Sequence, residues 1–178
     1  ETQQTIACEP GKMPFSVWLI PEEKHFGQFQ ELINRLAQEN NSPTFVPHCT
    51  LVGKIVLDPI FSFDDIKTFC NEISSVSLNV SKLMSEKTLF KSLFIQLIKD
   101  KFIVDLQKKI ANIFIKRGPY HFDPHLSLMY KIVSDVKQKK ITAGISLPDH
   151  INFDRISIVN TGETVDNWDS VFNQKISE

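Results

Sequence analysis

The chain has 178 residues, of which 42% are hydrophobic and 14 are Phe, so it is long enough for one large domain or for two small lobes that share a core. Its 20 basic and 21 acidic residues give a net charge of −1, which provides no general attraction for duplex nucleic acid. The longest apolar stretches, such as residues 93–98, are far too short to span a membrane. We therefore expect a non-membrane protein that binds a short or single-phosphate ligand.

The positions of the glycines and cysteines argue against two further classes of protein. The six glycines form no clustered phosphate-binding loop, which argues against a fold that binds dinucleotides or nucleoside triphosphates. The three cysteines, Cys8, Cys49 and Cys70, are unevenly spaced and match no metal-binding pattern, so we expect them to be structural thiols.

The first part of the chain is predicted to form a strand, a helix and a second strand. Residues 15–20 form an apolar run that Pro21 ends, which is typical of a buried strand. Apolar residues then recur at helical spacing over 26–36, and Pro47 begins the next strand. A helix over 62–73 and a half-buried strand over 76–81 follow this unit.

The same order returns in the second half. Residues 92–98 are predicted to form a strand, Asp100 can cap a helix, and apolar residues follow at helical spacing over 104–114. Pro124 then begins another strand. The remaining predicted elements are a basic helix over 134–142 and strands around 156–158 and 171–172.

The two strand–helix–strand units share a sequence motif. Residues 45–52, FVPHCTLV, recur 77 positions later as residues 122–129, FDPHLSLM. Two copies of one unit predict an α+β fold of two lobes, in which antiparallel sheets are duplicated by pseudo-twofold symmetry and helices lie outside a central cleft. We expect residues 1–178 to form a single domain of these two intertwined lobes, with one motif at 48–50 and the other at 125–127.

Each motif pairs an imidazole with a hydroxyl group. A strand places residues i and i+2 on one face, so His48 projects in the same direction as Thr50, and His125 as Ser127. With an ordinary pKa of about 6.5, one histidine can act as a general base and the other as a general acid near pH 7. The two hydroxyl groups can donate hydrogen bonds to the non-bridging oxygens of a phosphate. The pattern predicts cleavage of a phosphoester without a metal ion or another cofactor.

Other uses of the same residues have to be weighed. A lone histidine in an apolar strand is more often a core residue than a catalyst, but packing does not explain why the histidine–hydroxyl pair occurs twice. Zinc binding is the competing use, and Asp123 is the one nearby carboxylate. His121 lies four residues before His125 and borders the cleft if this segment is extended; a loop histidine is the alternative.

Three segments resemble the cyclic phosphodiesterases of plants and yeast, a branch of the 2H phosphoesterase superfamily. They are residues 16–21, 45–50 and 124–130, and the similarity in order and spacing extends from about Phe15 to Phe172. The resemblance implies a bilobal fold and a metal-free reaction in which water opens a cyclic phosphate. Relatives in this branch open ADP-ribose 1'',2''-cyclic phosphate and nucleoside 2',3'-cyclic phosphates, the latter to 2'-phosphates.

The resemblance also implies roles for individual residues. His48 and His125 correspond to the catalytic acid and base, and Thr50 and Ser127 to the phosphate-binding residues. Within the histidine pair, His125 is assigned to activation of water and His48 to protonation of the leaving oxygen. The aromatic residues that flank the base correspond to Trp18, Phe90 and Tyr130.

We therefore expect a cyclic phosphodiesterase that acts as a monomer on a small cyclic-phosphate nucleotide or on the 3'-end of an RNA fragment. Two alternatives stay open. An RNA-end-processing enzyme of the same superfamily, either 2'-5' ligase-like or exonuclease-like, needs a basic groove for the strand, and this composition offers little for one. A non-catalytic nucleotide-binding module tolerates loss of a histidine, whereas here both histidines and both hydroxyl residues are present.

Overall fold

The computed structural model describes residues 14–57, 60–114, 121–162 and 164–176; Cys8 lies outside these ranges. In chain order the elements are β1 (Pro14–Pro21), α1 (Glu23–Asn40), β2 (Cys49–Val56), α2 (Asp64–Glu72), β3 (Val76–Met84), η1 (Leu89–Lys91), β4 (Leu93–Leu97), α3 (Lys101–Ile113), β5 (His125–Met129), α4 (Asp135–Ala143), β6 (His150–Asn160), η2 (Val165–Asn167) and β7 (Asp169–Lys175). Every predicted strand and helix is confirmed. The two 3₁₀ turns, η1 and η2, were not predicted.

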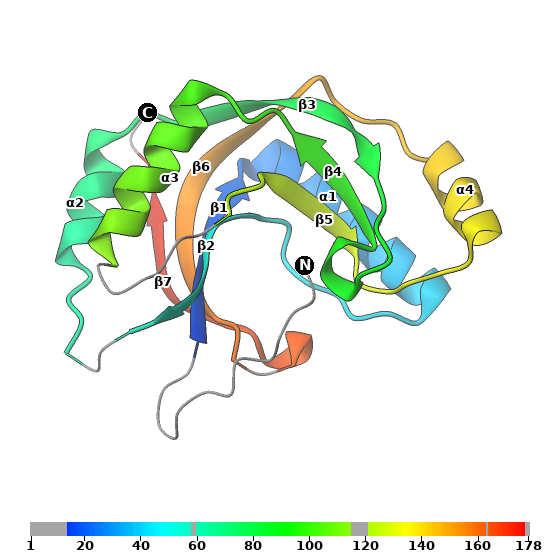
Figure 1. Cartoon of the computed structure of the whole chain (residues 1–178), viewed down its shortest axis with the longest axis horizontal. Helices are drawn as coiled ribbons and strands as arrows, with labels where there is room; N and C mark the ends of the chain where they lie inside the picture. The colour runs from blue at the N-terminus through cyan, green and yellow to red at the C-terminus, as the bar shows by residue number, and fades with distance from the viewer. Residues whose placement is uncertain (1–13, 58–59, 115–120, 163, 177–178) are drawn as a thin grey trace.

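The described strands form one antiparallel sheet in the order β1-β2-β5-β4-β3-β6-β7 (Figure 1). The α+β class is confirmed, but the duplicated sheets are joined. β2 and β5 meet at the residue pair Cys49 and Leu126. On the other side, β6 is long enough to pair with β3 near its start and with β1 along the rest of its length. The strands of the two units therefore share one curved sheet.

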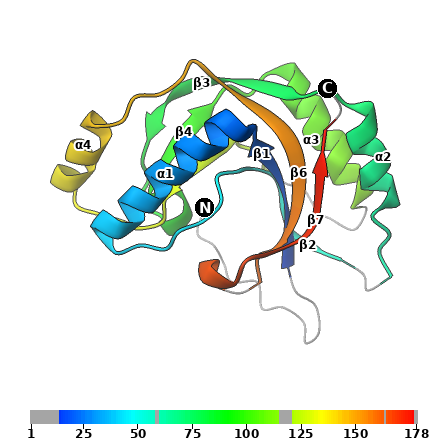
Figure 2. The same cartoon turned by 180° about the vertical axis from the view of Figure 1, so that it is seen from behind.

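Each unit packs its helix on a strand of the other unit. α1 contacts β5, and the Lys131 ammonium group that follows β5 donates a hydrogen bond to the carbonyl oxygen of Asn40 at the end of α1 (2.6 Å). α3 contacts β2, where the Gln107 side chain donates to the carbonyl oxygen of Leu51 (3.2 Å). Figure 2 shows α1 lying across the outside of the second unit's strands. The helices therefore add to the contacts that the strands make between the two units.

Alternation along β2 and β5 separates the core from the motif residues. Cys49 and Leu51 on β2, and Leu126 and Leu128 on β5, are fully buried in the main hydrophobic core. The motif histidines and hydroxyl residues alternate with them and therefore lie on the opposite, concave face of the sheet.

Three further features concern the helices. The Asp100 side chain accepts a hydrogen bond from the backbone N–H of Ile103 (2.9 Å), which confirms the predicted cap of α3. α4 contributes no buried residue to the core. Within the described ranges, no helix is both long and apolar enough to cross a membrane.

Candidate active site

The pairing of Cys49 with Leu126 brings the two motifs together. Because β2 and β5 are antiparallel, this register places His48 opposite Ser127 and Thr50 opposite His125. The two histidines are then diagonal neighbours, and residues in such positions lie about 7–8 Å apart, with their Cβ atoms somewhat closer. The pair Cys49–Leu126 marks the pseudo-twofold axis, so each unit supplies one imidazole and one hydroxyl group to the same patch of the concave face.

Both imidazole rings are held by the same hydrogen bond. Nδ1 of His48 lies 2.7 Å from the carbonyl oxygen of Val46, and Nδ1 of His125 lies 2.8 Å from the carbonyl oxygen of Asp123. A carbonyl oxygen can only accept, so Nδ1–H is the donor in each ring. Nε2 is consequently the atom of each ring that can take up or deliver a proton. In both motifs a proline with fixed φ separates the carbonyl from the histidine, which explains why the turn is the same.

The environment of the histidines changes their proton affinity. His48 is buried, and burial lowers its pKa to about 4; the hydrogen bond to the Val46 carbonyl opposes this and the charge of His125 adds to it. Burial also lowers the pKa of His125, against the hydrogen bond to the Asp123 backbone, and the charge of Lys91 lowers it further. The sequence could not give these shifts, because its expectation used the ordinary pKa. In the free protein both rings are neutral at pH 7.

The two hydroxyl residues, Thr50 and Ser127, differ in their surroundings. The Ser127 hydroxyl donates to the carbonyl oxygen of Phe90 (2.8 Å), and the buried Tyr130 side chain hydrogen-bonds to Ser127. Thr50 is half-buried and pairs with Trp18 across β1 and β2. Ser127 must therefore turn away from Phe90 before it can donate to a ligand, a requirement that the sequence did not predict.

A cluster of aromatic rings surrounds His48. Trp18 stacks on its imidazole with ring centroids 3.6 Å apart and an angle of 12° between the planes. Tyr130 stacks on Phe45 (3.8 Å) and contacts Phe90 edge-on (4.9 Å). The three aromatic residues that the resemblance placed beside the base are thus brought near one histidine, although Trp18 and Tyr130 are each only 4% exposed.

Trp168 is an aromatic residue of this cluster that the sequence reasoning missed. Its ring centroid lies 5.6 Å from that of Trp18, 6.4 Å from His48, 6.1 Å from Phe90 and 5.9 Å from Tyr130. It follows η2, far along the chain from either motif, so spacing gave no signal for it. The one available signal was that the chain contains only two tryptophans.

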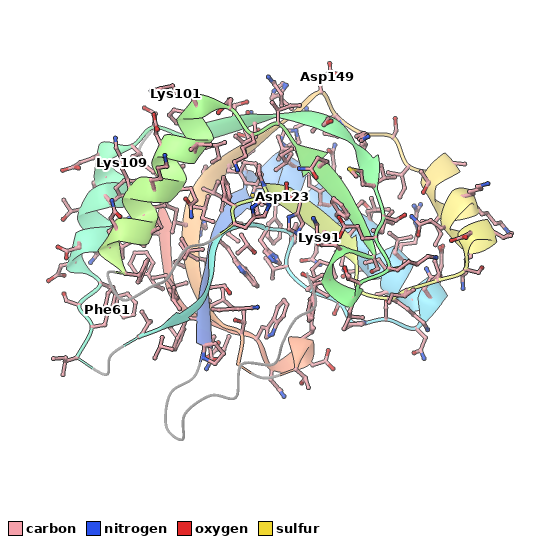
Figure 3. The ribbon with its side chains drawn as sticks, viewed as in Figure 1. Phe61, Lys91, Lys101, Lys109, Asp123 and Asp149 are labelled. Carbon is pink, nitrogen blue, oxygen red and sulfur yellow. The ribbon has the colours of Figure 1, made fainter. Side chains whose placement is uncertain are left out.

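The second motif has a polar network that the first lacks. The Asp123 carboxylate accepts hydrogen bonds from Lys91 (2.8 Å) and from Gln96 (2.8 Å), and Lys91 also pairs with Glu86 (3.3 Å). Lys91 and Asp123 are labelled in Figure 3. Burial alone would raise the pKa of Asp123, but these two donors lower it. The network fixes Asp123, whose carbonyl oxygen holds His125; Val46 occupies the equivalent position beside His48.

Asp123, the one carboxylate that could have joined a histidine in a zinc site, is thus directed at Lys91 and Gln96. His121 is exposed. Among the residues that the structure describes, no group of three or more His, Cys, Asp or Glu side chains is arranged to hold a metal ion.

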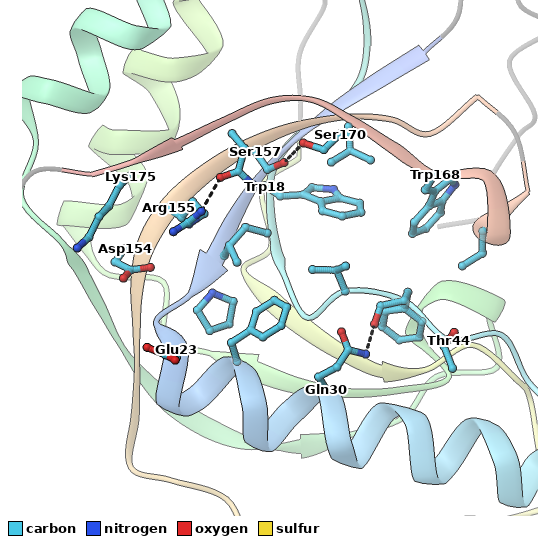
Figure 4. A pocket seen from close by; sticks show the side chains of 18 of the residues that line it. Trp18, Glu23, Gln30, Thr44, Asp154, Arg155, Ser157, Trp168, Ser170 and Lys175 are labelled. Atoms are coloured by element: carbon cyan, nitrogen blue, oxygen red, sulfur yellow. Dashed lines mark hydrogen bonds between the residues drawn. The ribbon is translucent and has the colours of Figure 1, made fainter.

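A cavity of about 800 Å³ lies next to the aromatic cluster, although none of His48, Thr50, His125 and Ser127 is among the residues that line it (Figure 4). Trp18 and Phe45, which both contact the His48 ring, form part of its wall, together with Trp168. The rest of the cavity is bounded by the end of β1, the first half of α1, the segment before β2, η2, β6 and β7.

A shared antiparallel sheet with two His-x-(Thr/Ser) motifs paired on its concave face defines the 2H phosphoesterases. The model of the family described as cyclic phosphodiesterase-like protein matches residues 13–175. The chain belongs to this family and is a phosphoesterase.

Known proteins are similar over nearly the whole chain. The cyclic phosphodiesterase of Arabidopsis thaliana is 24% identical over 173 residues, which cover 92% of this chain and 95% of that protein. The structure of Escherichia coli LigT complexed with 3'-AMP has a TM-score of 0.56 at 10% identity and covers 94% and 99% of the two chains. TT0787 of Thermus thermophilus has a TM-score of 0.59 at 9% identity and covers 92% and 98%. The two structures confirm the fold.

Proposed function

We propose that the protein is a metal-independent cyclic phosphodiesterase that hydrolyses a small cyclic phosphate. The substrate is a nucleoside 2',3'-cyclic phosphate, opened to the 2'-phosphate, or ADP-ribose 1'',2''-cyclic phosphate, or both. The observation that carries this proposal is the arrangement around Cys49 and Leu126, where both imidazoles are held through Nδ1 and present Nε2 to one patch. The name of the Arabidopsis relative and the 3'-AMP bound to LigT agree with a nucleotide substrate.

The proposed reaction needs two proton transfers. His125, neutral, takes a proton from water through Nε2 while the water oxygen attacks phosphorus. As the bond from phosphorus to the ring oxygen breaks, His48, protonated, delivers a proton to that oxygen. Thr50 and Ser127 donate hydrogen bonds to the two non-bridging oxygens, where charge accumulates. One water is consumed. The reaction leaves His125 protonated and His48 neutral, so His125 releases a proton to solvent and His48 takes one up before the next turnover.

His48 can act as the acid only if the bound substrate raises its pKa. Burial holds that pKa at about 4 in the free protein. A single negative charge at about 4 Å contributes about 4 kcal/mol at an effective dielectric constant of 20, which corresponds to a rise of about three in pKa. The cyclic phosphate therefore raises the pKa of His48 to near neutral pH. Stacking on the face of Trp18 also favours the imidazolium form.

The aromatic cluster supplies the wall for the base in this proposal. Trp18 stacks on His48, Trp168 contacts the same imidazole edge-on, and Phe90 and Tyr130 contact Trp168 in turn. Because each unit supplies one histidine and one hydroxyl residue, a complete site needs both units. We accordingly propose that residues 1–178 act as one domain and that a monomer is sufficient.

The test is to incubate the protein with EDTA and with ADP-ribose 1'',2''-cyclic phosphate, the four nucleoside 2',3'-cyclic phosphates and a short RNA that ends in a cyclic phosphate. Phosphorus NMR identifies each product and therefore the bond that is cleaved. The proposal expects at least one small cyclic phosphate to be opened faster than the RNA. Turnover of the RNA alone would favour an RNA-end-processing enzyme, and no turnover of any substrate would favour a binding module.

A further inference from the structure

A network of side chains holds the turn that leads into the second motif. The Asp123 carboxylate accepts a hydrogen bond from Lys91 through one oxygen and from Gln96 through the other (2.8 Å each; Figure 3). The Gln96 amide also donates to the carbonyl oxygen of Pro124 (3.1 Å), and Gln96 pairs with His125 across β4 and β5. The network therefore fixes this turn through both its side chain and its backbone.

Lys91 is itself held in place by η1 and the residues around it. The backbone N–H of Glu86 donates to the carbonyl oxygen of Lys91 (2.8 Å), and the Glu86 carboxylate pairs with the Lys91 ammonium group (3.3 Å). On either side of Lys91, the Phe90 carbonyl oxygen accepts from the Ser127 hydroxyl (2.8 Å), and the Ser92 hydroxyl donates to a carbonyl oxygen at the end of β5 (2.7 Å). The Lys91 side chain is only 21% exposed, so solvent screens its charge in part.

The charges of this network act on His125 in opposite directions. Burial lowers the pKa of His125, the hydrogen bond to the Asp123 backbone opposes this, and the charge of Lys91 lowers the pKa further. The carboxylates of Asp123 and Glu86 raise it. A general base has to be neutral before it can accept a proton. The carboxylate that ties the turn would therefore by itself favour the wrong form of His125, and Lys91 offsets its charge.

The first motif is built without such charges. Val46 occupies the position that corresponds to Asp123, and its side chain can form neither an ion pair nor a hydrogen bond. From β2, His48 and Cys49 are uncharged neighbours of His125 at pH 7, since burial lowers the pKa of His48 to about 4 and raises that of Cys49 to about 12. Both imidazoles make the same Nδ1 hydrogen bond, so a difference between acid and base has to come from outside the motifs.

We propose that Lys91 is a positioning residue of the general base: it holds the turn before His125 and cancels the charge of the Asp123 carboxylate. The ion pair lets a carboxylate fix the turn while His125 stays in the neutral form that takes a proton from water. This inference rests on the proposed function, in which His125 activates water. In this role Lys91 acts through Asp123 and His125 and not through the substrate.

The first test measures the pKa of His125 in two variants by nitrogen NMR of its Nε2 atom. Lys91→Gln and Asp123→Asn each remove one charge and keep an amide that can hydrogen-bond within the network. Lys91→Gln leaves two uncompensated carboxylates and should raise the pKa of His125, whereas Asp123→Asn removes a carboxylate and should lower it. A network that only packs the turn gives no such opposite pair of shifts, so any other pattern overturns the proposal.

Lys87→Gln is the matched control for both tests. Lys87 lies four residues before Lys91 and forms an exposed ion pair with Asp135 (2.6 Å), so its substitution also breaks a lysine–aspartate pair. Because this pair is outside the network, Lys87→Gln should change neither the pKa of His125 nor turnover. A shift in Lys87→Gln as large as that in Lys91→Gln would overturn the specific role of Lys91.

The second test follows turnover of a cyclic phosphate at pH 6 and pH 8. In Lys91→Gln more of His125 is protonated, so kcat relative to the wild type should fall about 10-fold at pH 6 and recover at pH 8. Adding Asp123→Asn to Lys91→Gln removes the unpaired carboxylate and should restore most of the loss. A loss that is equal at both pH values, or that the second substitution does not relieve, would mean that Lys91 only stabilises the fold and would overturn the proposal.

The NMR test needs no turnover and therefore separates this inference from the proposed function. If the two variants shift the pKa of His125 in opposite directions and no cyclic phosphate is hydrolysed, the coupling of Lys91 to His125 stands and the proposed activity fails. If a cyclic phosphate is hydrolysed but the opposite shifts are absent, the proposed activity stands and the role of Lys91 is wrong.

Discussion

Binding of an anion at the paired motifs should protonate His48. In the free protein, burial lowers the pKa of His48 to about 4, so at pH 6 only about one molecule in a hundred carries the proton. A bound phosphate at about 4 Å supplies about 4 kcal/mol in favour of the imidazolium form, a rise of about three in pKa. At pH 6 the liganded protein should therefore be mostly protonated at His48.

Nitrogen NMR of protein labelled at histidine measures this change for each ring separately. In the free protein Nε2 of His48 should give the signal of an unprotonated nitrogen, because Nδ1–H is held by the Val46 carbonyl. Titration with inorganic phosphate at pH 6 should convert it to the signal of a protonated nitrogen, while the exposed His150 serves as the internal control. A neutral His48 in the saturated complex would refute the reasoning and remove it as the general acid.

Four further outcomes are expected. His48→Ala and His125→Ala should each lower kcat about 10²- to 10⁴-fold, and Thr50→Ala and Ser127→Ala should cost less; wild-type turnover in either histidine variant would make that residue structural. On a cyclic phosphate with an activated leaving group, His48→Ala should lose much less activity than His125→Ala, and the reverse order would exchange the acid and base assignments. EDTA should leave steady-state rates unchanged, because the motifs supply the proton transfers and phosphate contacts; a loss that zinc or magnesium restores would contradict this. Since the folded pKa of His48 lies below its unfolded value of 6.5, the unfolded chain binds more protons at this residue, and His48 alone should lower stability by about 3 kcal/mol as the pH falls from 6.5 to 4; the stability of His48→Gln, measured by urea unfolding, should depend less steeply on pH.

Sequence repetition was sufficient to identify the residues that meet on the concave face. The two motifs have the same local pattern, so period-two alternation around Cys49 and Leu126 places their polar side chains on one side of the sheet. The cap at Asp100 was equally local and equally predictable.

Properties that depend on tertiary contacts were not predictable in this way. The exchange of α1 and α3 between the units and the joining of the sheets depend on pairings between distant segments. The low pKa of His48 follows from burial of the ring in the folded protein, which no motif encodes. Trp168 reaches the site from a turn beside β7, and nothing in its local sequence indicates that position.

The most direct test of two-histidine catalysis is a double-mutant cycle. The kcat values of the wild type, His48→Ala, His125→Ala and the double variant should be measured on one cyclic phosphate in EDTA, after circular dichroism has shown that all four are folded. If the two imidazoles act as one unit in a single reaction, the double variant should be no slower than the slower single variant, because either loss alone already disables the pair. A double variant whose loss equals the product of the two single losses would mean that the histidines act independently and would contradict the proposed mechanism.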